Sequence, residues 1–201
     1  MFAQAIARLP GPDFCQGLTT SNLGTPDYGL MLQQHRAYVG TLQALGLTVV
    51  LLDPLAGYPD AYFVEDAAIV TPEVAVITRP ATLARRGEEQ ALAPVVSRCC
   101  PSERIVAPGT LEGGDVLFVE RRVFVGLSGR TNSEGARQLE RILGRFGYTV
   151  EAVPVAEGLH LKSSISYVGK NTLLLTAEMA EQPALRSFDH VIVDGYETYA
   201  A

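Results

Sequence analysis

Acidic side chains and one histidine stand at the starts of three similar segments of this sequence. Glu65 and Asp66 occur in "FVED", Glu112 and Asp115 in "LEGGD", and His160 in "GLHLKSS". A histidine can carry protons near neutral pH, whereas flanking leucines favour a buried structural role. The local sequence leaves both interpretations of the histidine open, so its position relative to the carboxylates has to decide between them.

The spacing of these polar residues is regular. Asp66, Asp115 and Ser164 are each 49 residues apart, and Glu112 and His160 differ by 48. If equal units are arranged around an axis, equivalent positions share one radius and height. We therefore expect these side chains to converge on a single central site.

The elements that position them form a repeat. Three segments share the order strand, tight turn, strand, helix, strand, and their hairpin tips at Pro72, Arg121 and Lys170 are 49 residues apart. One supersecondary unit per period of this size predicts a propeller or array. The hairpins and last strands of the three units are predicted at 66–78 and 104–108, at 115–127 and 148–155, and at 164–176 and 190–195.

Residues 1–53 predict a partial fourth unit of strand, long loop, helix and strand. The helix is expected from about Asp27, which follows Pro26 and is a good N-cap, to Gly46. It leads into "TVVLLD", which predicts a buried strand. This unit lacks one strand of its hairpin, and in a closed ring we expect that strand to come from sequence beyond residue 201.

The other helices have local signals of their own. After Ser133 an apolar stripe at 3.6-residue spacing predicts a helix that Asn132 or Ser133 caps and Gly147 ends. Pro94 is expected to kink or shorten the preceding helix. The segment "AEMAEQPALRS" predicts the helix of the last unit.

Composition limits the class of protein. The chain has 201 residues, 47% of them hydrophobic and 19% charged, which is enough to bury a core in one domain. The net charge of −6 and the absence of Lys/Arg runs longer than two residues argue against nucleic-acid or anionic-membrane binding and weakly favour a small cationic ligand. No signal peptide or membrane span is visible, so we expect a cytoplasmic protein. Cys15, Cys99 and Cys100 are badly spaced for disulfides or zinc and are expected to be reduced.

Several features have ordinary structural explanations. The glycines of "LEGGD" could serve positive φ angles in a turn, and Arg85 and Arg130 could be solvated loop charges. Two arginines after different hairpins could equally bind a ligand carboxylate in a bidentate manner. His35, on the first helix, and His190, which begins a predicted buried strand, are expected to be structural.

Five motifs in order carry a resemblance to a known family. "LTTSNLGTPDY", "FVEDAAIV", "EGGDVLF", "GLSGRTN" and "GLHLKSS" resemble the dimethylarginine dimethylaminohydrolases, which are guanidine-modifying enzymes of the pentein superfamily. The resemblance covers the whole chain. It implies an α/β fold, a five-bladed propeller of repeated ββαβ units, with about four units in one domain over residues 1–201 and an incomplete C-terminal part.

The resemblance also implies roles for individual residues. His160 would be the general acid and base, and Glu112 would orient it and keep it protonated. Glu65 and Asp66 would bind the guanidinium of a small methylated arginine. The amino group of that substrate would meet Asp60 and the backbone of Leu18, and its carboxylate would meet Arg85 and Arg130.

The nucleophile is the main departure from the family pattern. Family members carry a catalytic cysteine in an Asn-Cys step shortly after a stretch like "ETYAA", and this sequence stops at Ala201. The cysteine of a thiouronium intermediate is therefore expected just beyond Ala201, and the chain alone is expected to be inactive. No metal or organic cofactor is expected.

Two other functions and one question of assembly are left open. The chain could be an arginine deiminase-like hydrolase of another guanidine, although arginine deiminases share less of these motifs. It could also be a noncatalytic propeller that binds a guanidine or another protein. A homodimer is left open.

Overall fold

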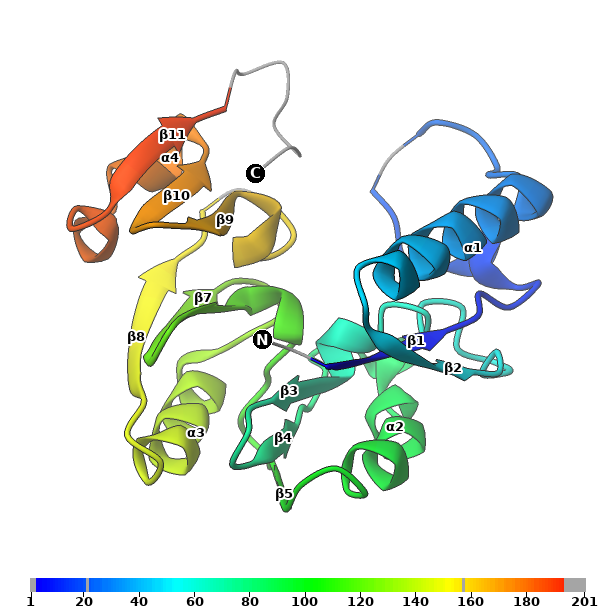
Figure 1. Ribbon diagram of the computed structural model, residues 1–201, viewed down its shortest axis with the longest axis horizontal. Coiled ribbons are helices and arrows are strands. Elements are labelled where there is room, and N and C mark those ends of the chain that lie inside the picture. Colours follow the sequence, from blue (N-terminus) through cyan, green and yellow to red (C-terminus); the bar gives the residue numbers. More distant parts are fainter. Residues whose placement is uncertain (1–2, 21, 157, 194–201) are drawn as a thin grey trace.

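The computed structural model of this chain describes residues 3–20, 22–156 and 158–193. In these ranges the strands form four separate sheets that follow one another around a common centre as an open arc (Figure 1). None of the helices in the described ranges is long and apolar enough to cross a membrane. An α/β architecture with repeated units is thus confirmed, while closure into five blades stays a prediction.

Three of the sheets have the same topology. The first two strands pair antiparallel as a hairpin, and after a helix the third strand pairs parallel with the second. The second unit comprises β3 (Ala68–Val70), β4 (Ala75–Ile77), α2 (Glu88–Val96) and β5 (Ser102–Arg104). The third comprises β6 (Val116–Val119), β7 (Arg122–Leu127), α3 (Ser133–Gly144) and β8 (Thr149–Pro154). The fourth comprises β9 (Ile165–Gly169), β10 (Thr172–Leu175), α4 (Ala177–Ala180) and β11 (Asp189–Ile192).

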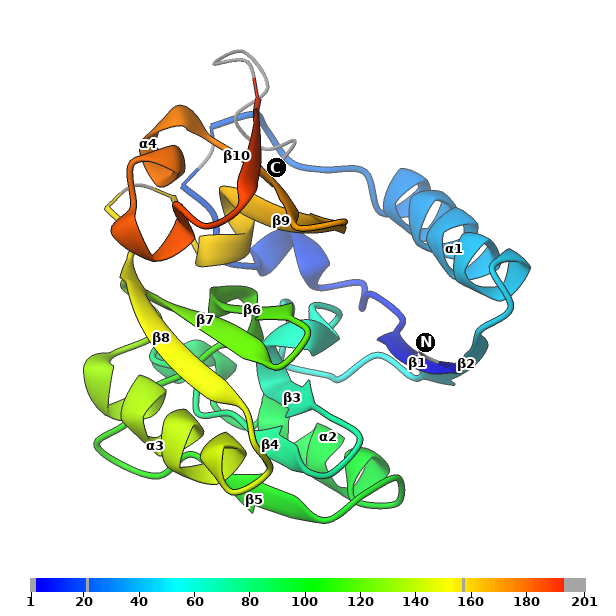
Figure 2. The same cartoon turned by 60° about the vertical axis from the view of Figure 1, so that its left-hand side comes forward.

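The first unit is partial, as its sequence predicts. It consists of β1 (Gln4–Arg8), α1 (Tyr28–Ala44) and β2 (Thr48–Leu52), and the two strands pair in parallel. Among the described residues β1 has no antiparallel partner, although the middle strand of every other sheet has one. Figure 2 shows α1 standing apart from the sheets of the third and fourth units.

Short 3₁₀ turns place the polar motifs at one end of the sheets. The turns η2 (Val64–Ala67), η4 (Gly113–Asp115) and η5 (Leu161–Ser163) each lead into the first strand of a unit. η2 contacts η4, and η4 contacts η5. The convergence expected from the 49-residue spacing is therefore confirmed for these three turns.

Capping residues define the helix starts. The Asp27 carboxylate accepts a hydrogen bond from the Leu30 amide at 2.7 Å, and the Asn132 side chain accepts one from the Gly135 amide at 2.8 Å. Gly147, at φ +79°, follows α3 in the left-handed region that favours glycine. The predicted starts of α1 and α3 are confirmed.

The apolar core lies between neighbouring units. One cluster joins Val76 of the second unit to Val125 and Leu139 of the third. Another joins Phe124 of the third unit to Leu173 of the fourth. Because burying apolar surface is the dominant favourable contribution to folding, each unit depends on its neighbour for stability.

Several predicted elements differ from the structure. The third strand of the second unit ends at Arg104 and not at 108, because the chain turns where the Gly109 amide bonds to the Val106 carbonyl. Pro94 was expected to kink or shorten its helix, and it lies inside α2, which has nine residues and ends two residues later at Val96. The predicted last helix is one turn, α4, followed by a 3₁₀ turn that begins at Pro183, because proline lacks the amide donor of a continuing helix.

Two strands predicted to be buried are partly or largely exposed. In β2, Leu51 is 46% exposed, and Leu52 is the one side chain of this strand packed against a cluster of the apolar core. In β11, Val191 and Ile192, which follow His190, are exposed because no side chain of this strand belongs to a core cluster of the described residues. The predicted end of that strand at 194–195 lies outside the described residues.

Candidate active site

His160 and Glu112 form a buried pair. Nε2 of the imidazole lies 3.0 Å from Glu112 Oε2, and the two residues are 7% and 0% exposed. The imidazole as a whole also lines the cavity described below. The expectation that the histidine lies beside a carboxylate is therefore confirmed in its geometry.

The field around His160 favours its charged form. Burial by itself lowers the pKa of the imidazole, but the Glu112 hydrogen bond and the charges of Asp66 and Asp115 outweigh burial and raise the pKa above its usual value. A histidine of this kind holds its proton near neutral pH and can donate it to a leaving group.

The glycines of "LEGGD" make room for these groups. Gly113 and Gly114 lie in the turn η4, but neither has a positive φ, so the interpretation that they serve positive φ angles is wrong. A Cβ on Gly113 would lie 1.9 Å from the Glu65 carbonyl oxygen, and one on Gly114 would lie 2.7 Å from His160 Cγ. These distances are too short for any side chain, so the turn and the imidazole can approach only at glycine.

Glu112 is shared by three cationic side chains. Besides His160, the Arg130 guanidinium donates to Oε2 at 3.1 Å, and Arg85 Nη1 lies 3.5 Å from the same oxygen. A fully buried carboxylate requires such partners, since an unpaired buried charge is strongly unfavourable. Glu112 is thus held in place beside the imidazole by its three partners.

Arg85 lies within a cluster of carboxylates and is not a solvated loop charge. It is 4% exposed, donates through Nη1 to Asp66 Oδ2 at 2.8 Å and binds Glu88 through Nε and Nη2. Burial opposes its charge, but Glu88 and Asp66 raise the pKa of the guanidinium above its ordinary value. Burial also raises the pKa of Glu88, against the effect of Arg85.

Asp115 is wholly buried and anchors the loop that carries the histidine. Its Oδ1 accepts the Leu161 amide at 2.9 Å, and its Oδ2 accepts the Ser128 hydroxyl at 2.7 Å. Burial raises the pKa of this carboxyl more than these hydrogen bonds lower it. Asp115 therefore contacts the frame of the site and does not line the cavity.

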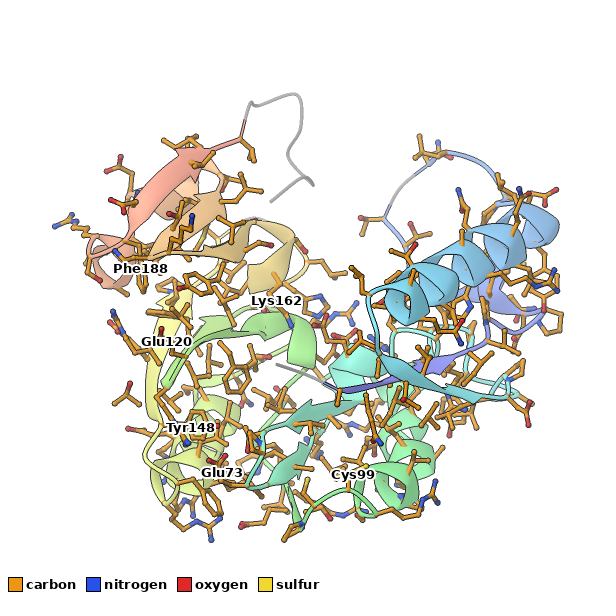
Figure 3. All side chains as sticks on the ribbon, viewed as in Figure 1. Glu73, Cys99, Glu120, Tyr148, Lys162 and Phe188 are labelled. Atoms are coloured by element: carbon orange, nitrogen blue, oxygen red, sulfur yellow. The ribbon has the colours of Figure 1, made fainter. Side chains whose placement is uncertain are left out.

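A cavity of about 940 Å³ lies over these groups. Among its walls the Leu18 amide donates to Asp60 Oδ2 at 3.0 Å, and Lys162 Nζ lies 2.5 Å from Glu65 Oε1. Lys162 lies close to the centre of the arc in Figure 3, well apart from Cys99 beside α2. The sequence-predicted site residues that line the cavity are Leu18, Asp60, Glu65, Asp66, Arg85, Arg130 and His160.

The same cluster has the donor atoms of a metal site. Asp66, Glu112 and His160 each offer one ligand atom, and these atoms lie within 4.8 Å of one another. The carboxylate oxygens of this set already accept hydrogen bonds from Arg85 and Arg130. A divalent cation would have to approach two guanidinium groups, so the donor set fits a cationic organic group better than a metal.

Sequence reasoning missed two residues of this region and misplaced a third. Glu88 pairs with Arg85 within "ARRGEE", but Arg85 ends a 3₁₀ turn and Glu88 begins α2 after Gly87 at φ +123°, so helical spacing gave no signal for this contact. Asp115 belonged to the repeat but was not separated from the ligand-facing carboxylates. Lys162 pairs with a residue 97 positions away, and local sequence contains no signal for that contact.

Comparison with known proteins gives a consistent result. The family model described as "N,N dimethylarginine dimethylhydrolase, eukaryotic" matches residues 28–195. A curated N(G),N(G)-dimethylarginine dimethylaminohydrolase of Pseudomonas aeruginosa is 41% identical over 203 residues, which cover 100% of this chain and 80% of the relative.

Solved structures agree. A cysteine-to-serine mutant of the Pseudomonas aeruginosa enzyme, complexed with citrulline, matches with a TM-score of 0.97 at 41% identity, covering 100% of this chain and 80% of that one. The N-terminal domain of ArgZ, a cyanobacterial arginine dihydrolase, matches with a TM-score of 0.80 at 18% identity, covering 96% and 76%, and shows the fold alone. This chain therefore belongs to the dimethylarginine dimethylaminohydrolase family.

Proposed function

We propose that this protein hydrolyses an Nω-methylated arginine to citrulline and an alkylamine, with His160 as general acid and base. The observation that carries the proposal is that His160 lines a cavity together with carboxylates and is paired with Glu112, which is fully buried and does not line the cavity. The relative with citrulline bound supports the same substrate class.

The cavity suits a guanidinium because such a group enters charged. Its pKa exceeds about 12, so burial requires opposite charge. Asp66 and Glu65 are the carboxylates we assign to it. We assign the substrate amino group to Asp60 and the backbone of Leu18, and its carboxylate to Arg130 and Arg85, of which Arg85 is fully engaged with carboxylates while the cavity is empty.

The chemistry divides into two halves around one histidine. A thiolate attacks the guanidinium carbon, and the C–N bond to the alkylamine breaks as protonated His160 gives that nitrogen its proton. Water then attacks the thiouronium carbon, and neutral His160 takes a proton from it. The thiolate leaves with its electron pair, and the hydroxyl of the adduct loses its remaining proton to solvent, so that the uncharged ureido group of citrulline forms. Positioned proton transfer of this kind typically contributes about 10²- to 10⁴-fold to the rate.

We propose that the thiolate belongs to a cysteine beyond Ala201. Within the described residues the polar contacts of His160 are made with carboxylates and none with a sulfur atom. Cys15 does not line the cavity, and Cys99 lines it beside α2, well apart from Lys162 of the histidine turn (Figure 3). Burial raises the pKa of Cys100, which disfavours its thiolate.

Replacement of His160 tests the proposed function. In protein expressed with the proposed cysteine-bearing continuation, His160→Ala should lower citrulline formation by at least about 100-fold while binding of Nω,Nω-dimethyl-L-arginine is kept. His190→Ala is the matched control, because that imidazole bonds to the Leu185 carbonyl away from the cavity. Near-normal turnover in His160→Ala would exclude the proton-transfer role.

A second candidate is a related guanidine hydrolase or a binding-only protein. The carboxylate cluster favours both, since it recognises the charged group and not its methyl substituents. Isothermal titration of arginine, monomethylarginine and dimethylarginine separates the substrates, and binding without turnover in the extended protein would favour the noncatalytic function.

A further inference from the structure

One ion pair crosses the mouth of the cavity. Lys162 Nζ, on η5 of the fourth unit, lies 2.5 Å from Glu65 Oε1, on η2 of the second unit. Both residues line the cavity, and their side chains are 24% and 68% exposed. The pair therefore links two walls of the cavity without being buried in the core.

This pair differs from the buried pairs beneath it. Exposed ion pairs contribute little to stability because water screens the charges and two long side chains lose freedom. Within the described residues Lys162 is the one cation paired with Glu65, whereas Asp66 holds Arg85 in a buried geometry. The Glu65 pair is thus the one that an incoming ligand can break most easily.

We propose that Lys162 is a positioning residue that acts as an internal competitor for Glu65. Lys162 binds the Glu65 carboxylate while the cavity is empty and releases it when a cationic guanidinium binds. It binds the carboxylate again when the bound group has become an uncharged urea. This inference rests on the proposed function, because it requires a cationic substrate and a neutral product.

The exchange follows from the shapes and charges of the groups. A guanidinium offers a planar fork of donors to a carboxylate, whereas an ammonium is a point charge that water solvates well. The substrate therefore displaces Lys162, which solvent can accept. The ureido group of citrulline keeps N–H donors but has no charge, so it cannot hold Glu65 against the lysine, and product release is favoured.

Lysine reactivity provides a direct test. The chain has two lysines, Lys162 and Lys170, and the second lies exposed at the β9–β10 turn. A limiting amine-acylating reagent, read by mass spectrometry, should modify Lys162 about two- to fivefold faster when saturating Nω,Nω-dimethyl-L-arginine is bound, because the amine released from Glu65 is more accessible to the reagent. Citrulline should leave the rate unchanged, and Lys170 should not respond to either ligand.

Substitution gives an independent test on the same protein. Lys162→Met should tighten binding of dimethylarginine about two- to fivefold and leave that of citrulline unchanged. Lys162→Arg should weaken binding of dimethylarginine and leave that of citrulline unchanged, because its guanidinium offers Glu65 the same planar fork of donors as the substrate does. In a Glu65→Gln background Lys162→Met should have no effect, and Lys170→Met is the matched control for lost positive charge.

The outcomes separate this inference from the proposed function. If dimethylarginine binds but Lys162 reactivity and the Lys162→Met affinity do not change, the competitor role is excluded and the proposed function stands. An equal gain in affinity for dimethylarginine and citrulline would also exclude it. If dimethylarginine does not bind the parent protein at all, the proposed function and this inference both fail.

Discussion

Two junctions between neighbouring units are built alike and used differently. At the Asp66 junction, η2 meets η4, and Asp66 Oδ1 accepts the Gly114 amide at 2.9 Å. At the Asp115 junction, η4 meets η5, and Asp115 Oδ1 accepts the Leu161 amide at 2.9 Å. In both, an aspartate at the same position of the repeat fastens the turn of the next unit.

The second oxygen of each aspartate distinguishes the junctions. Asp66 Oδ2 faces the Arg85 guanidinium at the cavity, whereas Asp115 Oδ2 accepts the neutral Ser128 hydroxyl and is sealed from solvent. The repeat therefore supplies the frame at both places. Only the aspartate whose second partner is charged and open to the cavity belongs to the candidate site. We therefore expect ligand affinity to depend on the charge of Asp66 and stability to depend on the hydrogen bonds of Asp115.

The largest expected effect is the loss of charge at Asp66. Asp66→Asn keeps an acceptor for the Gly114 amide but removes the charge that we assign to the guanidinium, and affinity for Nω,Nω-dimethyl-L-arginine should fall about 100-fold. Asp115→Asn should change it less than about twofold. Isothermal titration measures both, and equal losses would show that the two aspartates do not differ in function.

Stability should depend on the hydrogen bonds of Asp115 and not on its charge. Asp115→Ala leaves the buried Leu161 amide without its acceptor, so the free energy of unfolding should fall by about 2 kcal/mol in urea titrations. Asp115→Asn keeps that acceptor and should lose less than about 1 kcal/mol. If asparagine were as disruptive as alanine, the junction would depend on charge after all.

The sequence allowed the frame to be predicted better than the contacts within it. The 49-residue spacing predicted that Asp66, Glu112 and His160 converge, because equivalent positions of a repeat share one location. It did not predict that Arg85 lies among carboxylates, since that contact depends on side-chain direction after an irregular 3₁₀ turn.

Exposure was predicted least well where the arc is open. β2 and β11 have apolar sequences typical of buried strands, yet their side chains are partly or largely exposed. The apolar residues of a strand show which side chains could be buried. Whether they are buried depends on neighbouring segments, which the sequence of the strand does not specify. The missing hairpin strand of the first unit was predictable because the repeat specified where it should be.

The pH dependence of stability should separate the Asp115 carboxyl from the His160 imidazole. Both have a folded-state pKa raised above the unfolded value, so the folded state binds more protons and the stability each contributes is lost as pH rises. The loss begins near pH 4 for Asp115 and near pH 6.5 for His160.

Variants assign the two losses. In urea titrations across pH, Asp115→Asn should reduce the loss that begins at lower pH, to which the raised pKa of Glu88 also contributes, and His160→Gln should remove the one that begins at higher pH. Stability that rose with pH in the window of either group would contradict the direction of its shift.

The smallest effects should occur at the outer ends of the same two junctions. Arg121 pairs with Glu73 at 2.7 Å and lies over the Tyr148 ring, whereas Arg122 contacts the rings of Phe124 and Phe188. Tyr148 and Phe188 lie at the edge of the arc in Figure 3, far from Lys162.

Both outer arginines contact aromatic rings and both form ion pairs, but Arg121 lies 2.7 Å from Glu73 whereas Arg122 lies 3.9 Å from Glu151, so salt should affect Arg121 more. Arg122→Met should lower the free energy of unfolding by about 0.5 kcal/mol with little dependence on ionic strength, because its ion pair is long and methionine retains apolar contact with the rings. The loss in Arg121→Met should shrink in 0.5 M NaCl, where the Debye length falls to about 4 Å. Urea titrations at two salt concentrations measure both losses. An equal response to salt would show that the contacts of Arg121 and Arg122 have the same electrostatic character, in contrast to those of Asp66 and Asp115.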